Sequence, residues 1–265
     1  MGATESTAIE VPFAQAYSLA VDGTGDQADI AFNSVLKPAN YISISAWVKP
    51  TDTVNYSKIL CFAFNAANWN SPHTAWNLAA NAAADPGTPM FEMATPDAEG
   101  FSGNNLGSGS TAWCRIESSA SIADGAWSHL VATYDGSNMR IYINSTLTGT
   151  RARTGIIYYN NNVPVIIGAG RDSTVQAGKD AFNGLIDEVG LWDVALSAAD
   201  ITAIYNSGTP TDLTRGSSYD SDKSGDLVGY WRFEENTGTT IADSSTNSNT
   251  AALINDATFS STIPS

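Results

Sequence analysis

Asp187 and Glu188 are adjacent acidic residues inside the run Leu185–Trp192. Hydrolysis of a glycosidic bond in a retaining mechanism needs two carboxyl groups that face one sugar from about 5 Å apart. Neighbouring residues of a strand point to opposite faces, so we expect these two not to act as a pair. We interpret them as capping and hydrogen-bonding groups at the edge of a sheet. Because the chain also lacks a Glu-x-Asp-x-x-Glu pattern, the sequence predicts that it is not an enzyme.

The histidines of the chain are His73 and His129, and neither belongs to a Ser-His-Asp or zinc-binding pattern. His129 follows Trp127 at the start of a predicted strand, where a structural hydrogen bond is the better interpretation. His73 lies in a long polar loop and is expected to be exposed, which leaves contact with a ligand open.

The sequence Asn68-Trp69-Asn70 places an indole ring between two side-chain amides. A sugar can stack on such a ring while its hydroxyls bond to the amides. The alternative is that the tryptophan pins its own loop to the domain. Tyr158-Tyr159, followed by asparagines at 160–162, forms a second patch of this kind. The predicted ligand-binding residues are Asn68, Trp69, Asn70, His73, Tyr158 and Tyr159.

The formal net charge is −15. Nucleic acids and anionic membrane surfaces require clustered lysine and arginine, so we expect neither as a partner. No segment is long and apolar enough for membrane insertion. The segment Met1–Val11 has neither a basic start nor an apolar run, so we expect no secretion through a signal peptide.

Cys61 and Cys114 both lie in apolar runs that resemble strands. They could form a disulfide across neighbouring strands or remain as buried free thiols, and we favour free thiols.

Alternating apolar residues predict strands in several segments. In Tyr41–Val48, isoleucine, alanine and valine side chains share one face, and the pattern stops at Pro50. Leu130–Tyr134 and Met139–Ile143 flank the turn sequence Asp-Gly-Ser-Asn and predict a β-hairpin. Further strands are predicted at Tyr17–Val21, Ile59–Phe64, Trp113–Glu117, Val163–Ile167, Leu185–Trp192 and Leu227–Phe233. Many short strands separated by turns predict an all-β, antiparallel β-sandwich.

One short α-helix is expected after Ser197, which starts a capping pattern with Asp200. Ile201, Ile204 and Tyr205 would share one face of this helix, and Gly208 would end it. Residues 209–225 are rich in glycine, serine and aspartate and indicate a linker.

The segment from Trp127 to Gly136, followed by Met139–Asn144, resembles the central hairpin of laminin G-like jelly rolls, which include the pentraxins. Phe182–Trp192 and the following helix resemble the closing strand and helix of the same concanavalin A-like modules. The resemblance covers roughly residues 13–206 and implies a jelly-roll fold. The family often has Asn-Gly after the second hairpin strand, where this chain has Asn144-Ser145, so we expect a longer loop here.

Residues 228–259 resemble the strands that normally open such a module, although here they come last. We therefore divide the chain into an N-terminal arm at 1–12, a jelly-roll core at 13–208, a linker at 209–225 and C-terminal strands at 226–265. The C-terminal strands would complete the same sandwich or pair with a neighbouring copy, and we favour closure within one chain.

Relatives such as the pentraxins bind calcium through loop oxygens, which implies a matching segment at 168–172. A glycine at Gly170 replaces an acidic ligand and Arg171 would repel a cation, so a double site is not expected. One weak calcium site using Asp172, Asp180 or Asp22 is the remaining expectation.

The late position of residues 228–259 and the run at 196–214 are similar to laminin G-like virion proteins of marine bacteriophages. This similarity implies a non-catalytic structural protein of the virion surface or an appendage, which contacts other virion subunits or copies of itself, and glycans. The alternative is a carbohydrate-binding module or lectin of a secreted or bacterial surface protein.

Overall fold

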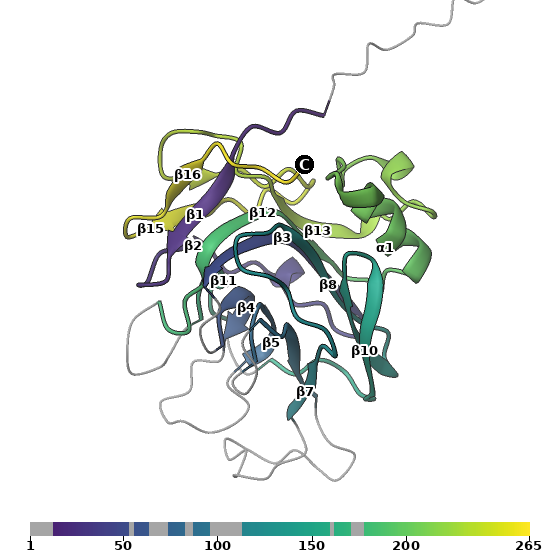
Figure 1. The fold of residues 1–265 in the computed structure, drawn as a ribbon. Coiled ribbons are helices and arrows are strands. Elements are labelled where there is room, and N and C mark those ends of the chain that lie inside the picture. Colours follow the sequence, from purple (N-terminus) through teal and green to yellow (C-terminus); the bar gives the residue numbers. More distant parts are fainter. Residues whose placement is uncertain are drawn as a thin grey trace, which may run out of the picture.

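The fold is a β-sandwich, seen in a computed structural model that describes residues 13–52, 56–63, 74–82, 87–95, 113–159, 162–170 and 178–265. These residues form two eight-stranded antiparallel sheets that face one another, with one short α-helix outside them (Figure 1). The predicted all-β sandwich is confirmed.

Sheet A carries the helix on its outer face. Its spatial order is β10 (Thr146–Ala152), β9 (Asn138–Ile143), β8 (Ser128–Tyr134), β3 (Ile42–Asp52), β12 (Asn183–Trp192), β1 (Ser18–Asp22) and β16 (Thr258–Ser260), with β13 (Leu227–Trp231) also beside β12.

Sheet B lies on the other side of the core. Its order is β14 (Thr240–Ile241), β15 (Ala251–Ile254), β2 (Gln27–Ile30), β11 (Val165–Ile167), β4 (Lys58–Ala63), β5 (Thr74–Ala79), β6 (Met90–Ala94) and β7 (Trp113–Glu117).

The main hydrophobic core fills the space between the sheets. Ile44 and Val48 of β3 belong to it, as do Leu60 and Phe62 of β4. This face of β3 is the one that alternation predicted. The strand itself continues past Pro50 to Asp52. Pro50 lies beyond the last residue pair between β3 and β8, Val48 with Ser128, so its missing N–H breaks no bond to β8.

The predicted hairpin is confirmed in β8 and β9, which pair from Leu130 opposite Ile143 to Tyr134 opposite Met139. The longer loop expected after β9 is wrong, because Ile143 pairs directly with Thr146 of β10. Asn144 and Ser145 have φ values of 49° and 62° and form a tight two-residue turn without glycine.

The C-terminal strands belong to both sheets of the same chain. β13 pairs with β12 and β16 with β1 in sheet A, while β14 and β15 extend sheet B beyond β2. Trp231 of β13 is fully buried and its indole nitrogen donates to the Asn249 carbonyl oxygen over 2.8 Å. These strands therefore contribute directly to the core of the sandwich.

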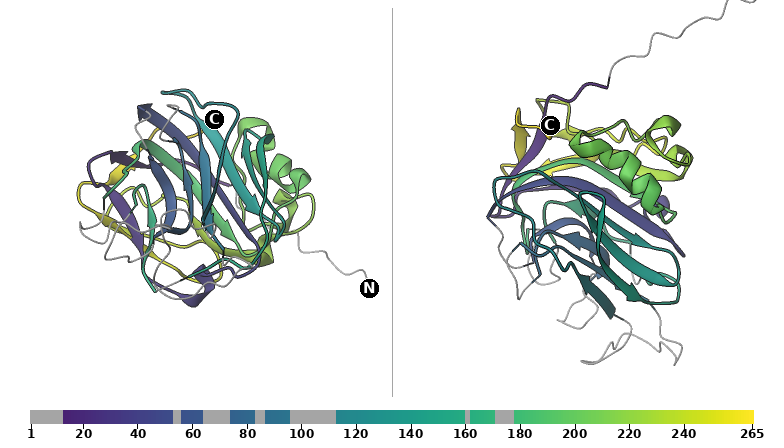
Figure 2. Two further views of the ribbon diagram at one scale, coloured as in Figure 1. Left: turned by 90° about the horizontal axis from the view of Figure 1, so that it is seen from below. Right: turned by 45° about the vertical axis from the view of Figure 1, so that its right-hand side comes forward.

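The helix α1 (Ala198–Tyr205) lies on the face of sheet A that points away from sheet B, as Figures 1 and 2 show. The predicted cap is confirmed, since Ser197 accepts from the Asp200 amide and Asp200 accepts from the Ser197 amide. The helix ends at Asn206, which has a φ of 45°, rather than at Gly208.

Residues 209–225, predicted as a linker, are fixed to this outer face. Leu213 and Tyr219 are buried in a second hydrophobic cluster with Ile201 and Ile204 of α1. The segment contains the short 3₁₀ helices η3 (Gly216–Ser218) and the start of η4 (Ser224–Asp226). Ser221 also donates its backbone amide to Asp200 over 2.8 Å.

Cys61 and Cys114 are buried free thiols. Cys61 lies on β4 and Cys114 on β7, with β5 and β6 between them. Among the described helices, none is long and apolar enough to cross a membrane.

Candidate functional site

The edge of β12 is shared by two strands that meet at an irregular point. β1 pairs with Asn183–Ile186 and β13 pairs with Val189–Trp192. Asp187 and Glu188 occupy the junction between these two pairings, where the register of β12 against β3 also shifts. Glu188 has a φ of 49°, so the strand bulges here.

The expectation that Asp187 and Glu188 point to opposite faces is wrong, because the bulge interrupts the alternation of side chains. The side-chain amide of Gln15 lies 3.3 Å from a carboxylate oxygen of Asp187 and 3.3 Å from one of Glu188. Both carboxylates therefore reach the same donor. A glycine inside a strand pattern can indicate a bulge, and Gly190 is the signal of this kind in the sequence.

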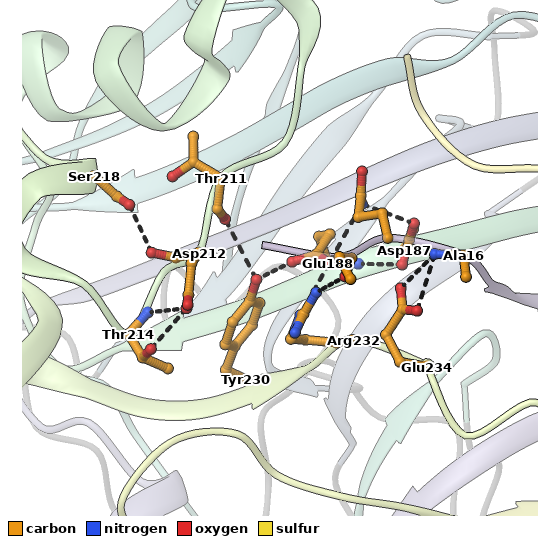
Figure 3. Close-up of polar contacts among 12 residues, drawn as sticks. Ala16, Asp187, Glu188, Thr211, Asp212, Thr214, Ser218, Tyr230, Arg232 and Glu234 are labelled. Atoms are coloured by element: carbon orange, nitrogen blue, oxygen red, sulfur yellow. Dashed lines mark hydrogen bonds and ion pairs between the residues drawn. The ribbon is translucent and has the colours of Figure 1, made fainter. Parts of the chain in front are cut away.

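The chain before β1 and the chain after β13 are held together at this junction (Figure 3). Arg232 lies 3.3 Å from Glu188 and donates to the Ala14 carbonyl oxygen over 2.5 Å. Both carboxylate oxygens of Glu234 accept from the backbone amide of Ala16, at 2.9 and 3.1 Å. The junction thus fixes residues 13–16 to the rest of the sandwich.

Burial dominates the electrostatics of the junction. Asp187 is fully buried and Glu188 is 2% exposed. Burial raises the pKa of Glu188 to about 8, although the nearby Arg232 guanidinium acts in the opposite direction. Burial, followed by repulsion from Glu188, raises the pKa of Asp187 well above its usual range. At neutral pH, Glu188 is therefore mostly protonated.

The oxygens of both carboxyl groups are occupied by groups of the same chain. Asp187 accepts from the Glu188 amide over 2.9 Å and from Gln15. Glu188 is bonded to Gln15, to Arg232 and to the Tyr230 hydroxyl, which also lies 3.4 Å from the Thr211 carbonyl oxygen (Figure 3). This arrangement joins the strands at the junction and keeps both carboxyl groups buried.

His129 makes the structural hydrogen bond that the sequence predicted. Its Nε2 lies 2.7 Å from the Ser45 hydroxyl, and its ring stacks with Trp47 and with Tyr205 of α1. Burial lowers the pKa of His129 to about 3, so the ring is neutral under ordinary conditions.

The first predicted sugar patch, Asn68, Trp69, Asn70 and His73, lies outside the described residues. In the second patch, the Tyr159 hydroxyl accepts from the Trp76 indole over 3.0 Å and donates to the Pro38 carbonyl oxygen over 2.9 Å. Tyr158 is half-buried, and its backbone amide donates to the Ala94 carbonyl oxygen over 2.9 Å. Ligand binding by the two tyrosines stays a prediction.

Beside Tyr159 lies a group of side chains that sequence reasoning missed. The Lys37 ammonium is 5.0 Å from the centre of the Phe32 ring, 5.7 Å from that of Phe62 and 5.3 Å from that of Tyr159. It also donates to the Asn162 side-chain oxygen over 2.6 Å. We call these five residues the Lys37 cluster.

The Lys37 cluster combines loop residues with Phe62 of β4. The short 3₁₀ helix η1 (Ser34–Leu36) directly precedes Lys37 and is capped by Asn33. Asn33 also donates to Asn249 over 2.8 Å. The Tyr159 ring meets Phe62 edge-on, with centroids 5.0 Å apart. These contacts fix the rings of Tyr159 and Phe62, while Phe32 is 36% exposed.

The structure describes two of the three predicted calcium ligands. Asp172 lies outside the described residues. Asp22 accepts from the amide and hydroxyl of Thr24, and the Asp180 carbonyl oxygen accepts from the Lys58 amide. Within the described ranges, no three histidine, cysteine or acidic side chains are grouped as metal ligands. A calcium site stays a prediction.

Comparisons with known proteins agree with this fold. The rat sushi, von Willebrand factor type A, EGF and pentraxin domain-containing protein 1 is 22% identical over 210 residues, covering 76% of this chain. The chain spans only 5% of that relative's length.

Two solved structures share the fold. A Bacteroides ovatus protein assigned a carbohydrate-binding role matches with a TM-score of 0.65 and 15% identity, over 96% of this chain and 62% of that one. The CBM40 module of a Ruminococcus gnavus sialidase, bound to α2,3-sialyllactose, matches with a TM-score of 0.54 and 13% identity, over 71% of this chain and 96% of that one.

The family model described as the concanavalin A-like lectin/glucanases superfamily matches residues 22–202, which is more than half of the chain. The chain therefore belongs to the concanavalin A-like lectin/glucanase superfamily.

Proposed function

We propose that the chain is a non-catalytic, lectin-like glycan-binding module of a bacteriophage virion surface or appendage protein. The observation that carries the glycan-binding part is the Lys37 cluster. It offers a partly exposed aromatic ring, Phe32, beside an exposed side-chain amide, Asn162, on a rigid sandwich. A sugar needs this combination, because its C–H face stacks on a ring and its hydroxyls bond to polar groups.

The surroundings of Asp187 and Glu188 support the absence of catalysis. A glycosidase requires one carboxyl group to donate a proton and another to reach the sugar or a water. Here both groups are buried and bonded to Gln15, Arg232 and Tyr230. We expect no release of reducing sugar from a broad polysaccharide panel, and any measurable release that Glu188→Gln abolishes would contradict this part of the proposal.

The comparisons support glycans as the partner class. The family includes lectins, and the Ruminococcus module was solved with a bound sialylated sugar. Fold similarity does not transfer a ligand, so the test is direct binding.

A glycan array tests the binding function. We expect the purified chain to bind a restricted set of sugars and Phe32→Ala to lose most of that binding. Tyr41→Ala is the matched control, because Tyr41 is also an exposed aromatic residue, at 46% exposure, and lies outside the Lys37 cluster. Absence of binding to every sugar would refute the glycan-binding function.

The virion role is supported by the resemblance of residues 196–214 and 228–259 to virion proteins of marine bacteriophages. It implies contacts with other virion subunits or with copies of this chain. Light scattering with and without a chelator tests self-association. A defined oligomer supports the assembly role, and dissociation by the chelator would support calcium. A monomer that also fails to bind purified virion subunits would favour a carbohydrate-binding module of a secreted or bacterial surface protein.

A further inference from the structure

Lys37 is a positive charge that has no carboxylate partner among the described residues. Buried Lys58 differs in this respect, since its ammonium lies 3.2 Å from a carboxylate oxygen of Glu92. The hydrogen-bond acceptor at Lys37 is the neutral amide oxygen of Asn162. No carboxylate of the described residues therefore neutralises Lys37, although the chain as a whole has a formal charge of −15.

Partial burial strengthens the attraction between the Lys37 ammonium and an anion. Lys37 is half-buried, and desolvation lowers its pKa. A partly desolvated ammonium interacts more strongly with an anion than a fully hydrated one does. An ammonium has three N–H donors, and Asn162 accepts one of them. Among the described residues no other acceptor bonds to this ammonium, and we take its remaining donors to serve the oxygens of a ligand.

The rings hold the ammonium in place. Phe32, Phe62 and Tyr159 surround it at 5.0 to 5.7 Å, within the range of cation–π attraction. The Tyr159 ring is itself fixed by its bonds to Trp76 and Pro38. A fixed cation loses less conformational entropy when it binds a ligand than a freely moving lysine would.

We infer that Lys37 binds the anionic group of an acidic glycan, a carboxylate or sulfate on a sugar whose ring stacks on Phe32. Asn162 would bond to a hydroxyl of the same sugar. This inference specifies the ligand class of the proposed glycan-binding function and rests on that function.

Matched pairs of sugars test the charge requirement. The first pair is an oligogalacturonide and its methyl ester, which share a backbone and differ in the carboxylate. The second pair is dextran sulfate and dextran. We expect the wild-type chain to bind at least one acidic member about tenfold or more tightly than its neutral counterpart, with weaker binding at higher salt. The pair that shows the preference identifies the anion.

Substitution of the lysine tests its role. We expect Lys37→Met to lose about tenfold in affinity for the acidic sugar, and Lys37→Arg to retain most of it. Lys223→Met, at a lysine outside the Lys37 cluster, is the matched control and should bind like the wild type. An unchanged unfolding midpoint in Lys37→Met would show that the variant is folded.

The outcomes distinguish anion binding by Lys37 from glycan binding in general. If the chain binds neutral sugars on the array but shows no preference for acidic ones, Lys37 does not select an anion and the glycan-binding function stands. The same conclusion follows if Lys37→Met binds acidic sugars as the wild type does. If no sugar binds at all, both proposals fail together.

Discussion

Asp187 and Glu188 are consecutive residues of one strand, yet their carboxyl groups lie within reach of the same Gln15 amide. The left-handed backbone of Glu188, with a φ of 49°, produces this arrangement. It coincides with the point where β12 exchanges β1 for β13 as its neighbour. The buried acidic pair thus lies where an early strand, β1, and a late strand, β13, meet along β12.

The raised pKa of Glu188 predicts that this junction loses stability as the pH rises. In the unfolded chain glutamate loses its proton near pH 4.5, whereas folded Glu188 keeps its proton up to about pH 8. The unfolded state therefore binds fewer protons between these values, and the contribution of Glu188 to the free energy of unfolding declines. Over this pH range, the free energy of unfolding of Glu188→Gln should therefore fall by about 2–4 kcal/mol less than that of the wild type.

Urea unfolding at pH 5, 6.5 and 8 measures this effect as the difference between the variant and the wild type. Comparing the two chains cancels the titration of groups that do not interact with Glu188, such as His129, but not that of Asp187, whose pKa Glu188 raises. Asp124→Asn, at an exposed position, serves as the control and should follow the wild-type profile. Parallel profiles for Glu188→Gln and the wild type would show that Glu188 does not titrate as proposed.

Gly184 is predicted to be irreplaceable at its position in β12. Its φ is +146°, and an added Cβ would lie 2.3 Å from the Lys49 carbonyl oxygen and 2.9 Å from the Pro50 Cα. Both contacts are with backbone, which cannot easily move away. Gly184→Ala should therefore cost about 3 kcal/mol or more, or prevent folding.

Gly225→Ala is the matched control for Gly184→Ala, because nothing lies within 4 Å of its added Cβ. Its free energy of unfolding should stay within about 0.5 kcal/mol of the wild type. Thermal unfolding of both variants decides the question. Equal stability of the two variants would mean that β12 can move away from β3 at low cost.

The elements that the sequence predicted well are those that local residues determine. The β8–β9 hairpin follows from alternation around Asp135–Asn138, and Asp135 accepts from the amides of Ser137 and Asn138. The Ser197–Asp200 cap spans four residues. Such contacts depend on neighbours in the sequence, so patterns within a short window reveal them.

The junction at Asp187 and Glu188 and the Lys37 cluster both depend on contacts between residues that are far apart in the sequence. Gln15 meets Glu188 across 173 positions, and Lys37 meets Asn162 across 125. The packing of residues 209–225 was missed for the same reason. A polar sequence suggested a linker, whereas the buried contacts of Leu213 and Tyr219 with α1 come from the tertiary fold.

Both thiols are predicted to be unreactive in the folded chain and unable to form a disulfide with each other. Burial raises the pKa of Cys61 to about 11 and also raises that of Cys114. Three strand spacings, roughly 14 Å in total, separate β4 from β7, which exceeds the reach of a disulfide. Iodoacetamide should label neither cysteine in the native chain and both in guanidinium without a reductant. Fast native labelling, or fewer than two labels after unfolding, would contradict this prediction.

Arg232 is predicted to hold the residues before β1 on the sandwich. Its guanidinium lies 4.3 Å from the centre of the Phe13 ring, and it bonds to the Ala14 carbonyl oxygen and to Glu188. Arg232→Ala should let this segment detach more often and raise the rate of chymotrypsin cleavage after Phe13 by roughly tenfold. Intact-mass measurements over time give that rate.

Arg140→Ala is the control for Arg232→Ala, because Arg140 pairs with Asp135 in the β8–β9 hairpin and not with the residues before β1. Its cleavage after Phe13 should match the wild type. Urea unfolding of both variants distinguishes local detachment from a general loss of stability, since local opening leaves the global free energy of unfolding nearly unchanged. If Arg232→Ala is cleaved no faster than the wild type, the bonds of Glu234 to Ala16 suffice to hold the segment, and the contacts of Arg232 with Phe13 and Ala14 do not restrain it.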